Sequence, residues 1–553
     1  MSNNNTKLQI GLCLAGAVSA GAYTAGVMDY LLEALEAWQK RKDNNTPNTP
    51  MHEVEITVIG GGSAGGMTGI ITAAAIQEHF EPIRGLGGDL NKQQPQHKLY
   101  NAWVDLSSND MLSVMLDAQD LKGGKLPSLL NSSFIDGIAK KITTVSTDTP
   151  PKRPYFNPNL KVFVSLTNLQ GRSFKVPFMG GGANDYIVKY HNDYACFMLA
   201  DSESDYKKDG WMPLNFQKKL NTVVAEQAAM ATGAFPVGLQ ARTLRREVKY
   251  LKDLQLSRVN YKESIDLDDK LYHETLNIDG GILDNEPFQL MEEILGMDEK
   301  DKNTETFDKT VLMIDPFPSV GKPEKMQENS LIPNVLSLLN VLVTQSGIQP
   351  QTLAQLSQQQ GQKNTLDPFM ISPVRYEKKK NIETKVEGGK ALACGAVSGF
   401  SGFLHKEFRI HDYFMGRANC EKFLRDYFTV PADTTNRIFT EGYKHVTDKT
   451  MFITEDEGKK RLPIIPLFTP EQSEGYMPVF SNGAQWPTVS PVHFDRYKKQ
   501  LKERIGLTIF NVLPNAPLQV GAWTMGKLGF NAYLAEKSLT QLNEYLKEHE
   551  LIR

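Results

Sequence analysis

Cysteine is scarce in this chain, and its placement excludes a disulfide framework. The 553 residues include four cysteines, Cys13, Cys196, Cys394 and Cys420, and none of them stands in a CxxC or other metal-ligand spacing. This pattern also argues against a structural metal site and is typical of a reducing compartment. The net charge is only −3, so nothing in the composition points to a nucleic-acid partner.

Charged residues are absent from two long segments, Leu8–Met28 and Ile56–Gln77. Both are rich in Gly and Ala, and each opens like a strand before its glycines, so buried strand-turn-helix units explain them better than membrane spans. The first segment also imitates a signal peptide, with Lys7 before an apolar run and small residues at Ser19–Gly21. We reject cleavage there because it would remove glycines that the site described below needs. We therefore expect no transmembrane segment and a cytoplasmic location.

The first third of the chain alternates strand-like and helix-like patterns. Leu8–Leu14 and Val54–Ile59 read as apolar strands, and Ala22–Trp38 and Ala64–His79 read as the helices that follow them. Such alternation predicts a mainly parallel sheet with helices on both faces. Three later segments fit this scheme: Leu160–Leu166, Val223–Ala231 and Val311–Ile314. The segment Arg245–Asp269 is charged, and we expect it to be an exposed excursion.

Beyond about residue 320 the pattern changes. Leu331–Val343 is apolar and expected to be helical, and Leu518–Leu551 has helical periodicity. No motif in this part predicts a chemical role. We expect an α/β domain over residues 1–320 and a helix-rich C-terminal extension over residues 321–553.

A serine between glycines follows the second predicted strand. Gly61-Gly62-Ser63-Ala64-Gly65 fits G-x-S-x-G, the turn that exposes a nucleophilic serine at a helix N-terminus. Gly60, Gly62 and Gly65 also fit G-x-G-x-x-G, the dinucleotide-binding turn. A dinucleotide site needs a second strand about twenty residues on that ends in an acid, and none follows the helix here. The nucleophile is therefore the favoured interpretation of this turn, and a dinucleotide-binding protein stays an alternative.

A candidate base lies far downstream, in Asp279-Gly280-Gly281 directly after the strand-like Leu276–Ile278. Asp-Gly is also a common turn, and that interpretation has similar weight for this segment alone. A serine with a histidine and an acid is a further alternative, with His405 or His411 placed after Asp279 in the chain. Neither histidine has the glycine-rich context of a strand end. The first glycine turn, which begins at Gly16, could supply oxyanion-binding N–H groups or could serve only close packing.

With these residues in place, the chain resembles the patatin-like phospholipase family. The resemblance implies a three-layer α/β/α hydrolase with Ser63 as nucleophile and Asp279 as base, without a histidine, a metal or a cofactor. It implies backbone oxyanion donors at Gly16, Ala17, Val18 and Ala64, and a lipid substrate that is compatible with transient contact at a membrane surface. The matching blocks, in the family's order, are Leu14–Val27, Gly61–Gly69, Ala228–Pro236 and Asp279–Pro287, with a weaker likeness to a longer bacterial branch around Phe400–Phe428.

The first block departs from the family where many members have three glycines and a basic residue. Gly16, Ala17, Val18 and Ala20 stand at those positions. Because the donors are backbone groups, we expect Ala17 and Val18 to have ordinary negative φ, with side chains directed away from the substrate. The departure keeps a further alternative open, a non-catalytic scaffold on the same fold.

Overall fold

The structure is a computed structural model of the whole chain. The residues that it describes are 7–145, 150–176, 186–256, 259–260, 265–267, 270–318, 365–379, 382–456, 458–468, 475–513, 516–527 and 529–553.

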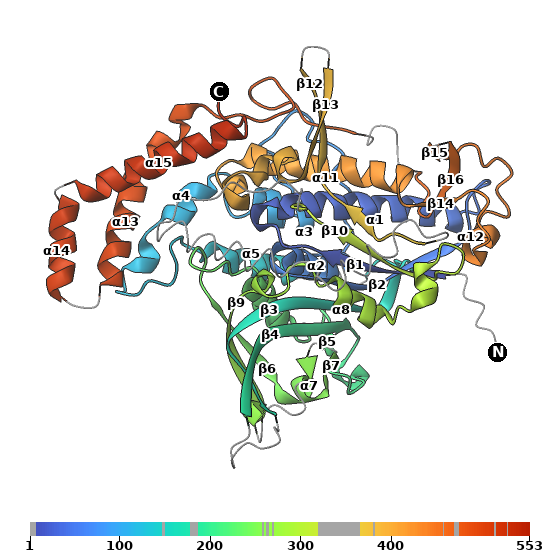
Figure 1. Ribbon diagram of the computed structural model, residues 1–553, viewed down its shortest axis with the longest axis horizontal. Helices are drawn as coiled ribbons and strands as arrows, with labels where there is room; N and C mark the ends of the chain where they lie inside the picture. The colour runs from blue at the N-terminus through green and yellow to red at the C-terminus, as the bar shows by residue number, and fades with distance from the viewer. Residues whose placement is uncertain are drawn as a thin grey trace.

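A nine-stranded sheet forms the centre of the molecule (Figure 1). Five neighbouring strands run parallel in the order β11-β10-β1-β2-β3. Beyond β3 the sheet is mixed, because β4 and β9 pair antiparallel with β3 whereas β5 pairs parallel with β4. The strands are β1 (Lys7–Leu14), β2 (Glu53–Gly61), β3 (Phe156–Val176), β4 (Tyr186–Leu199), β5 (Met212–Leu214), β6 (Arg242–Glu247), β9 (Tyr272–Asp279), β10 (Lys309–Ile314) and β11 (Phe369–Ile371).

The parallel strands are buried on both faces over most of their inner residues, which explains why their sequences are mainly apolar there. Alternate side chains of β1 enter different clusters: Leu12 and Leu14 pack with α1 (Gly21–Asp43) and α2 (Ser63–Ala75), whereas Cys13 packs with α8 (Phe288–Leu295). The period of two along a strand makes this division unavoidable. The arrangement confirms the predicted three-layer α/β/α fold with a mainly parallel sheet.

The C-terminal part is packed into this sheet and its helices. Strand β11 lies beside β10 at the edge of the central sheet, and α11 (Lys406–Asp426) lies along α1 (Figure 1). Arg417 of α11 is buried and pairs with Asp29 and Glu33 of α1. The boundary at residue 320 therefore stays a prediction, while residues beyond it complete the sheet and cover α1.

The other helices and strands are short or lie at the periphery. A helical arm of α13 (Lys498–Val512), α14 (Ala516–Lys527) and α15 (Phe530–Glu548) extends from the body (Figure 1). The remaining elements are α3 (Lys98–Tyr100), α4 (Met111–Leu116), α5 (Phe134–Thr143), α6 (Thr222–Thr232), α7 (Val248–Asp253), α12 (Arg437–Gly442), β7 (Gln255–Leu256), β8 (Val259–Asn260), β12 (Val374–Lys379), β13 (Ile382–Glu387), β14 (Thr429–Pro431), β15 (Thr454–Asp456) and β16 (Lys459–Pro463).

Most strands and helices predicted from periodicity are present, with one difference among the described residues. The segment Arg245–Asp269 is not simply an exposed excursion, because Arg246, Tyr250 and Leu251 are buried. The charged residues of this segment led to the prediction of exposure, but the segment also contains an amphipathic turn that packs against the sheet. The predicted helix Leu331–Val343 lies outside the described residues. Among the described helices, none is both long and apolar enough to cross a membrane.

Candidate active site

The turn between β2 and α2 has the geometry of a nucleophile elbow. Ser63 is the first residue of α2 and has a φ of 50°, in the left-handed region that few side chains tolerate. A Cβ at Gly61 or at Gly65 would overlap the carbonyl oxygen of Leu14, because the end of β1 packs directly against this turn. The two glycines are therefore required by close backbone approach, and the turn presents Ser63 at the end of the sheet.

Ser63 contacts Asp279 directly. The Ser63 Oγ donates a hydrogen bond to the Asp279 Oδ2 at 2.7 Å, and the other carboxylate oxygen accepts the Gly281 N–H at 2.8 Å. Both side chains are buried. Burial raises the pKa of Asp279 from near 3.8 to about 7, although the hydrogen bonds from Ser63 and Gly281 act in the opposite direction.

Strand pairing brings these two distant residues together. Asp279 ends β9, which pairs antiparallel with β3 in a register that sets Asp279 opposite Leu166. Strand β3 in turn lies beside β2, which leads to Ser63. A Cβ at Gly280 would overlap the carbonyl of Ser165, and one at Gly281 would lie 2.6 Å from the Asn285 Oδ1. The second and third residues of Asp-Gly-Gly are thus glycines because the turn after β9 is packed on both sides.

Thr232 is part of the site, and the sequence analysis did not single it out. It ends α6, and its Oγ1 accepts the backbone N–H of Ser63 at 2.9 Å. This bond occupies the amide of the serine itself and leaves the amide of Ala64 as the donor at the start of α2. Thr232 lies within Ala228–Pro236, one of the blocks that resemble the family. This block is the sequence feature that could have pointed to Thr232 as a site residue.

The first glycine turn lies against Ser63. A Cβ at Gly16 would be 2.8 Å from the Cβ of Ser63 and would overlap the amide oxygen of Asn285. In the part of the chain that the structure describes, the N–H groups of Gly16, Ala17, Val18 and Ala64 have no hydrogen-bond acceptor. Gly16 lies against Ser63, and Val18 and Ala64 line the same pocket as Ser63; the oxyanion role of the four N–H groups stays a prediction.

The backbone prediction for this turn is wrong at Val18. Ala17 has a φ of −152°, as expected, but Val18 has a φ of 47°, and its side chain lines the pocket instead of pointing away from it. The chain must reverse from β1 into α1 within a few residues, and a left-handed residue makes that reversal. The strained backbone is held by the C-terminal part: Ser19 Oγ donates to the Gly399 carbonyl and accepts the Gly402 N–H at 3.0 Å.

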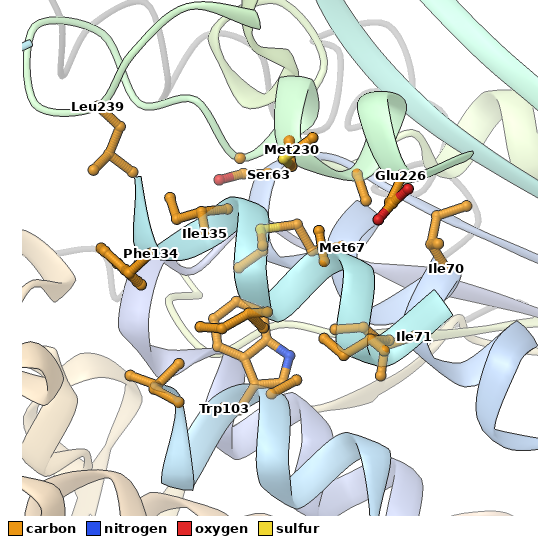
Figure 2. A pocket seen from close by; sticks show the side chains of 18 of the residues that line it. Ser63, Met67, Ile70, Ile71, Trp103, Phe134, Ile135, Glu226, Met230 and Leu239 are labelled. Atoms are coloured by element: carbon orange, nitrogen blue, oxygen red, sulfur yellow. The ribbon is translucent and has the colours of Figure 1, made fainter. Parts of the chain in front are cut away.

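An apolar pocket opens beside Ser63 and Asp279 (Figure 2). The empty space at this pocket amounts to about 840 Å³ when the adjoining open solvent is included. The side chains around it come from α2, α5 and α6, with Trp103 on one side. Its lining includes Met67, Ile70, Ile71, Trp103, Phe134, Ile135, Ile138, Ile142, Met230, Leu239 and Phe403, and Glu226 adds a carboxyl whose pKa is raised by burial. The pocket can hold a hydrocarbon chain with one end at the serine.

The competing motifs are less well placed. A Cβ at Gly60 would overlap the Phe163 ring, so this glycine serves core packing beneath the turn and does not face a ligand. Among the described residues, no group of His, Cys, Asp and Glu could hold a metal ion.

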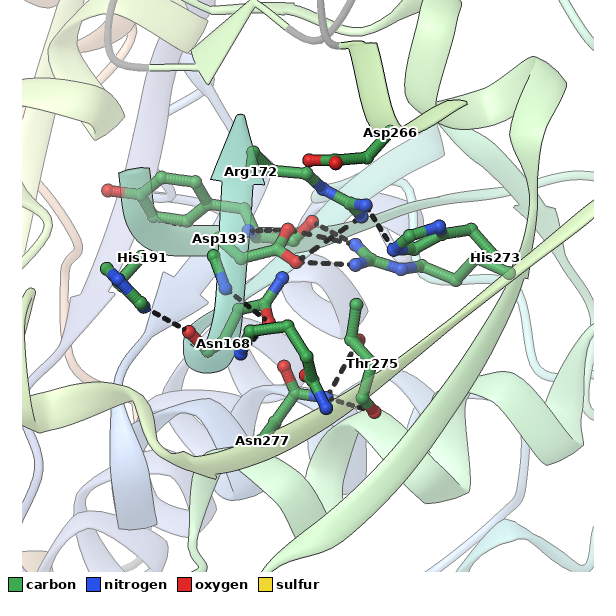
Figure 3. A network of polar contacts seen from close by, with 12 residues as sticks. Asn168, Arg172, His191, Asp193, Asp266, His273, Thr275 and Asn277 are labelled. Carbon is green, nitrogen blue, oxygen red and sulfur yellow. Dashed lines mark hydrogen bonds and ion pairs between the residues drawn. The ribbon is translucent and has the colours of Figure 1, made fainter. Parts of the chain in front are cut away.

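None of the ten histidines, all within the described residues, lines the pocket. His411 contacts Asp412, and His405 packs against His493. His273 belongs to a buried polar network with Arg172 and Asp193, in a part of β3 and β4 that lies away from Ser63 (Figure 3). Burial, followed by the nearby Arg172 guanidinium, lowers the pKa of His273 to about 4. These side chains have structural partners away from Ser63.

Comparison with known proteins identifies the family. The sequence profile of the patatin-like phospholipases matches residues 12–291, about half of the chain. The protein belongs to this family, whose name implies hydrolysis of lipid esters. The matched span includes Ser63, Asp279 and the first glycine turn.

Two individual proteins add context. The chain is 28% identical over 509 residues to the uncharacterized protein y4iI of Sinorhizobium fredii (strain NBRC 101917 / NGR234), covering 83% of this chain and 70% of that protein. It also aligns with the crystal structure of VipD from Legionella pneumophila at 13% identity, covering 75% of this chain and 67% of that one, with a TM-score of 0.22. A superposition of that quality supports no argument about fold or function.

Proposed function

We propose that this protein is a serine hydrolase that cleaves carboxylic ester bonds of lipids through an acyl-enzyme, with Ser63 as nucleophile and Asp279 as base. The observation that carries the proposal is the 2.7 Å contact between the two side chains at the wall of an apolar pocket. A pKa of about 7 suits a general base near neutral pH, because such a group is substantially ionised yet still binds a proton well.

The first half-reaction follows from this geometry. The ionised Asp279 accepts the hydroxyl proton of Ser63 as the Oγ bonds to the ester carbonyl carbon. The negative carbonyl oxygen is stabilised by the N–H groups around Gly16–Val18 and Ala64. When the tetrahedral intermediate collapses, the bond to the alcohol oxygen breaks, and Asp279 returns its proton to the leaving alcohol.

The second half-reaction repeats these steps with water. Water attacks the acyl carbon and gives a proton to Asp279. Collapse of the second intermediate releases the fatty acid and returns the proton to the Ser63 Oγ. The reaction as proposed uses no metal and no cofactor.

The pocket supports a substrate with a long acyl chain. Its side chains on α2 and α5 are almost all apolar, and Ser63 lies at its wall (Figure 2). Burying methylene groups there stabilises the bound chain by about 0.8 kcal/mol for each group. A cytoplasmic location is part of the proposal and is supported by four free, buried thiols.

The test compares wild type with Ser63→Ala on a fluorogenic phospholipid and with a fluorophosphonate probe. Ala fits the site because the glycines set the turn, so the variant should remain folded yet lose both hydrolysis and labelling. Ser204→Ala, an exposed serine in the same domain, is the matched control. Retained hydrolysis in Ser63→Ala would contradict the nucleophile, and a wild-type protein that neither labels nor hydrolyses lipid would favour the non-catalytic scaffold.

A further inference from the structure

The helical arm contains a long stretch without charge. From Ile505 to Gly526 the chain has 22 residues with no Asp, Glu, Lys or Arg. The stretch covers the second half of α13 and almost all of α14. In a water-soluble helix of this kind, charged residues would normally cover the outer face. The stretch therefore needs either a buried position or an apolar partner.

The structure does not bury it. Trp523 is 57% exposed, Val520 61% and Leu518 50%, and Met525 on the same helix and Val512 at the end of α13 are also exposed. Helix α14 lies at the far end of the arm, away from the central sheet (Figure 1). Exposed apolar side chains gathered on one element mark an interaction surface more often than isolated ones do.

The base of the arm is attached to the rim of the pocket. The buried Arg504 of α13 donates to the carbonyl oxygen of Leu129 at 2.5 Å and to the Asp120 carboxylate. Leu129 in turn donates its N–H to the carbonyl oxygen of Val237 at 2.8 Å. Leu129 and Val237 are both exposed, and Leu239, two residues further along, lines the pocket. The base of the arm is thus joined, through the exposed Leu129 and Val237, to the segment whose Leu239 lines the pocket.

Basic side chains flank this apolar surface. The Lys527 Nζ lies 3.8 Å from the ring centroid of Trp523. The loop with the exposed Lys122 and Lys125 is held against α13 by Asn511, whose Nδ2 donates to the carbonyl oxygens of Leu121 and Lys125. Glu503 is an exposed acid on this part of α13. An apolar tip with Trp and flanking Lys matches the interface of a bilayer with anionic headgroups.

We infer that α14, together with the rim residues Leu129 and Val237, docks the protein on an anionic lipid bilayer. The inference rests on the proposed function, because a lipid hydrolase must draw its substrate from such a surface. Since α14 has 12 residues and none of the described helices can span a membrane, the helix lies in the interface and does not cross it. When the protein is docked in this way, the site of hydrolysis faces the lipid bilayer from which the acyl chain enters.

Trp523 gives a direct readout of docking. Three of the five tryptophans are buried and Trp486 is half-buried, so Trp523 is the exposed one. In full-length Ser63→Ala protein, equimolar phosphatidylcholine–phosphatidylglycerol vesicles should shift its emission to the blue, and brominated acyl chains should quench it. Trp523→Phe should remove the response. An emission spectrum that vesicles leave unchanged would overturn the inference.

Affinity is measured by co-sedimentation with the same vesicles. The double variant Leu518→Ser/Trp523→Ser should bind at least tenfold more weakly than its parent. Met451→Ser/Val479→Ser, which removes two equally exposed apolar side chains elsewhere, should bind like the parent. Equal binding by both double variants would overturn the assignment of the surface. Pure phosphatidylcholine vesicles should bind more weakly, and equal binding to them would overturn the role of the lysines.

Two further measurements separate this inference from the proposed function. Leu518→Ser/Trp523→Ser with Ser63 intact should hydrolyse a water-soluble short-chain ester at the wild-type rate but lose vesicle hydrolysis. If the wild type hydrolyses nothing, the proposed function fails, while binding by Ser63→Ala still tests docking. Sedimentation velocity tests for a dimer. If the wild type forms a dimer that this double variant dissociates, and vesicle binding is unchanged, the surface is assigned to a second copy of the chain and the inference of membrane docking is overturned.

Discussion

Ser63 and Asp279 meet across 2.7 Å although 216 residues separate them in the chain. The carboxylate is buried, and its hydrogen-bond donors among the described residues are the Ser63 hydroxyl and the Gly281 N–H. Two neutral donors stabilise a buried anion only in part, which is why the pKa of Asp279 remains at about 7. This single value leads to the first two predictions.

The rate of ester hydrolysis should fall as the medium is acidified below pH 7. Protonated Asp279 cannot accept the proton of Ser63, so kcat/KM should decrease about tenfold for each pH unit well below the pKa of about 7. The measurement is a pH–rate profile on a soluble short-chain ester, with unfolding followed in parallel. A rate that is level between pH 5 and pH 8 would show that another group is the base.

Asp279→Asn should abolish turnover and yet stabilise the fold at alkaline pH. The native pKa is raised, so the folded protein binds more protons than the unfolded chain between about pH 4 and pH 7, and its stability falls as the pH rises through that window. The rise from 3.8 to about 7 corresponds to at most about 4 kcal/mol above pH 7. Asn removes this penalty while still accepting the Gly281 N–H.

Urea unfolding at pH 5 and pH 8 tests this effect. The gain in unfolding free energy from Asp279→Asn should be larger at pH 8 than at pH 5. Asp433→Asn, at an exposed position, is the control and should show no such difference. A variant that is less stable than wild type at pH 8 would contradict the assigned direction of the pKa.

Individual histidines should be dispensable for the chemistry. None lines the pocket, and His273, His405 and His411 each have partners elsewhere. Each single His→Ala variant should have a kcat within a few-fold of the wild-type value, provided that circular dichroism shows a folded protein. Loss of activity to the level of Ser63→Ala in a folded variant would establish a triad instead of a dyad.

Two substitutions in the first glycine turn should behave in opposite ways. Gly16→Val places a side chain against Ser63 and Asn285 and should lower kcat by roughly a hundred- to a thousand-fold, the usual effect of losing an oxyanion donor. Val18→Gly should keep near wild-type kcat, because glycine accepts the φ of 47° without strain. Relief of strain should offset the added chain entropy to within about 1 kcal/mol. Both variants are compared in one assay, and normal activity in Gly16→Val would show that the oxyanion site lies elsewhere.

Arg417 should be essential for attaching the C-terminal part. It is buried between Asp29 and Glu33 of α1, and the Arg417 charge helps to hold the pKa of Asp29 well below its usual range against burial. Arg417→Met removes the cation shared by two buried carboxylates, of which Asp29 keeps His97 and Glu33 keeps Arg84, and should lower the unfolding free energy by about 3 kcal/mol. Lys422→Met on the same helix breaks a partly exposed pair with Asp426 and should cost less than about 1 kcal/mol. Equal unfolding midpoints for the two variants would show that the pair is not a determinant of stability.

Local sequence was sufficient to predict several features. Gly61, Gly65 and the glycines after Asp279 mark turns in which backbone passes so close that no Cβ fits, and such turns are visible in the sequence because only glycine permits them. The strands β1 and β2 and the helices α1 and α2 follow from apolar runs and periodicity. These patterns depend on neighbours in the chain, so the sequence alone determined the fold class and the position of the candidate serine and aspartate.

Tertiary structure decided the rest. Val18 has a left-handed φ next to Ser19, which Gly399 and Gly402 hold from 380 and 383 residues away. The role of Thr232 depends on where the end of α6 meets the start of α2. The burial of Arg417 depends on two carboxylates of α1. Each of these features arises from side chains and backbone that meet only after folding, so no local spacing in the sequence could predict it, whereas the turns that local sterics control could be predicted.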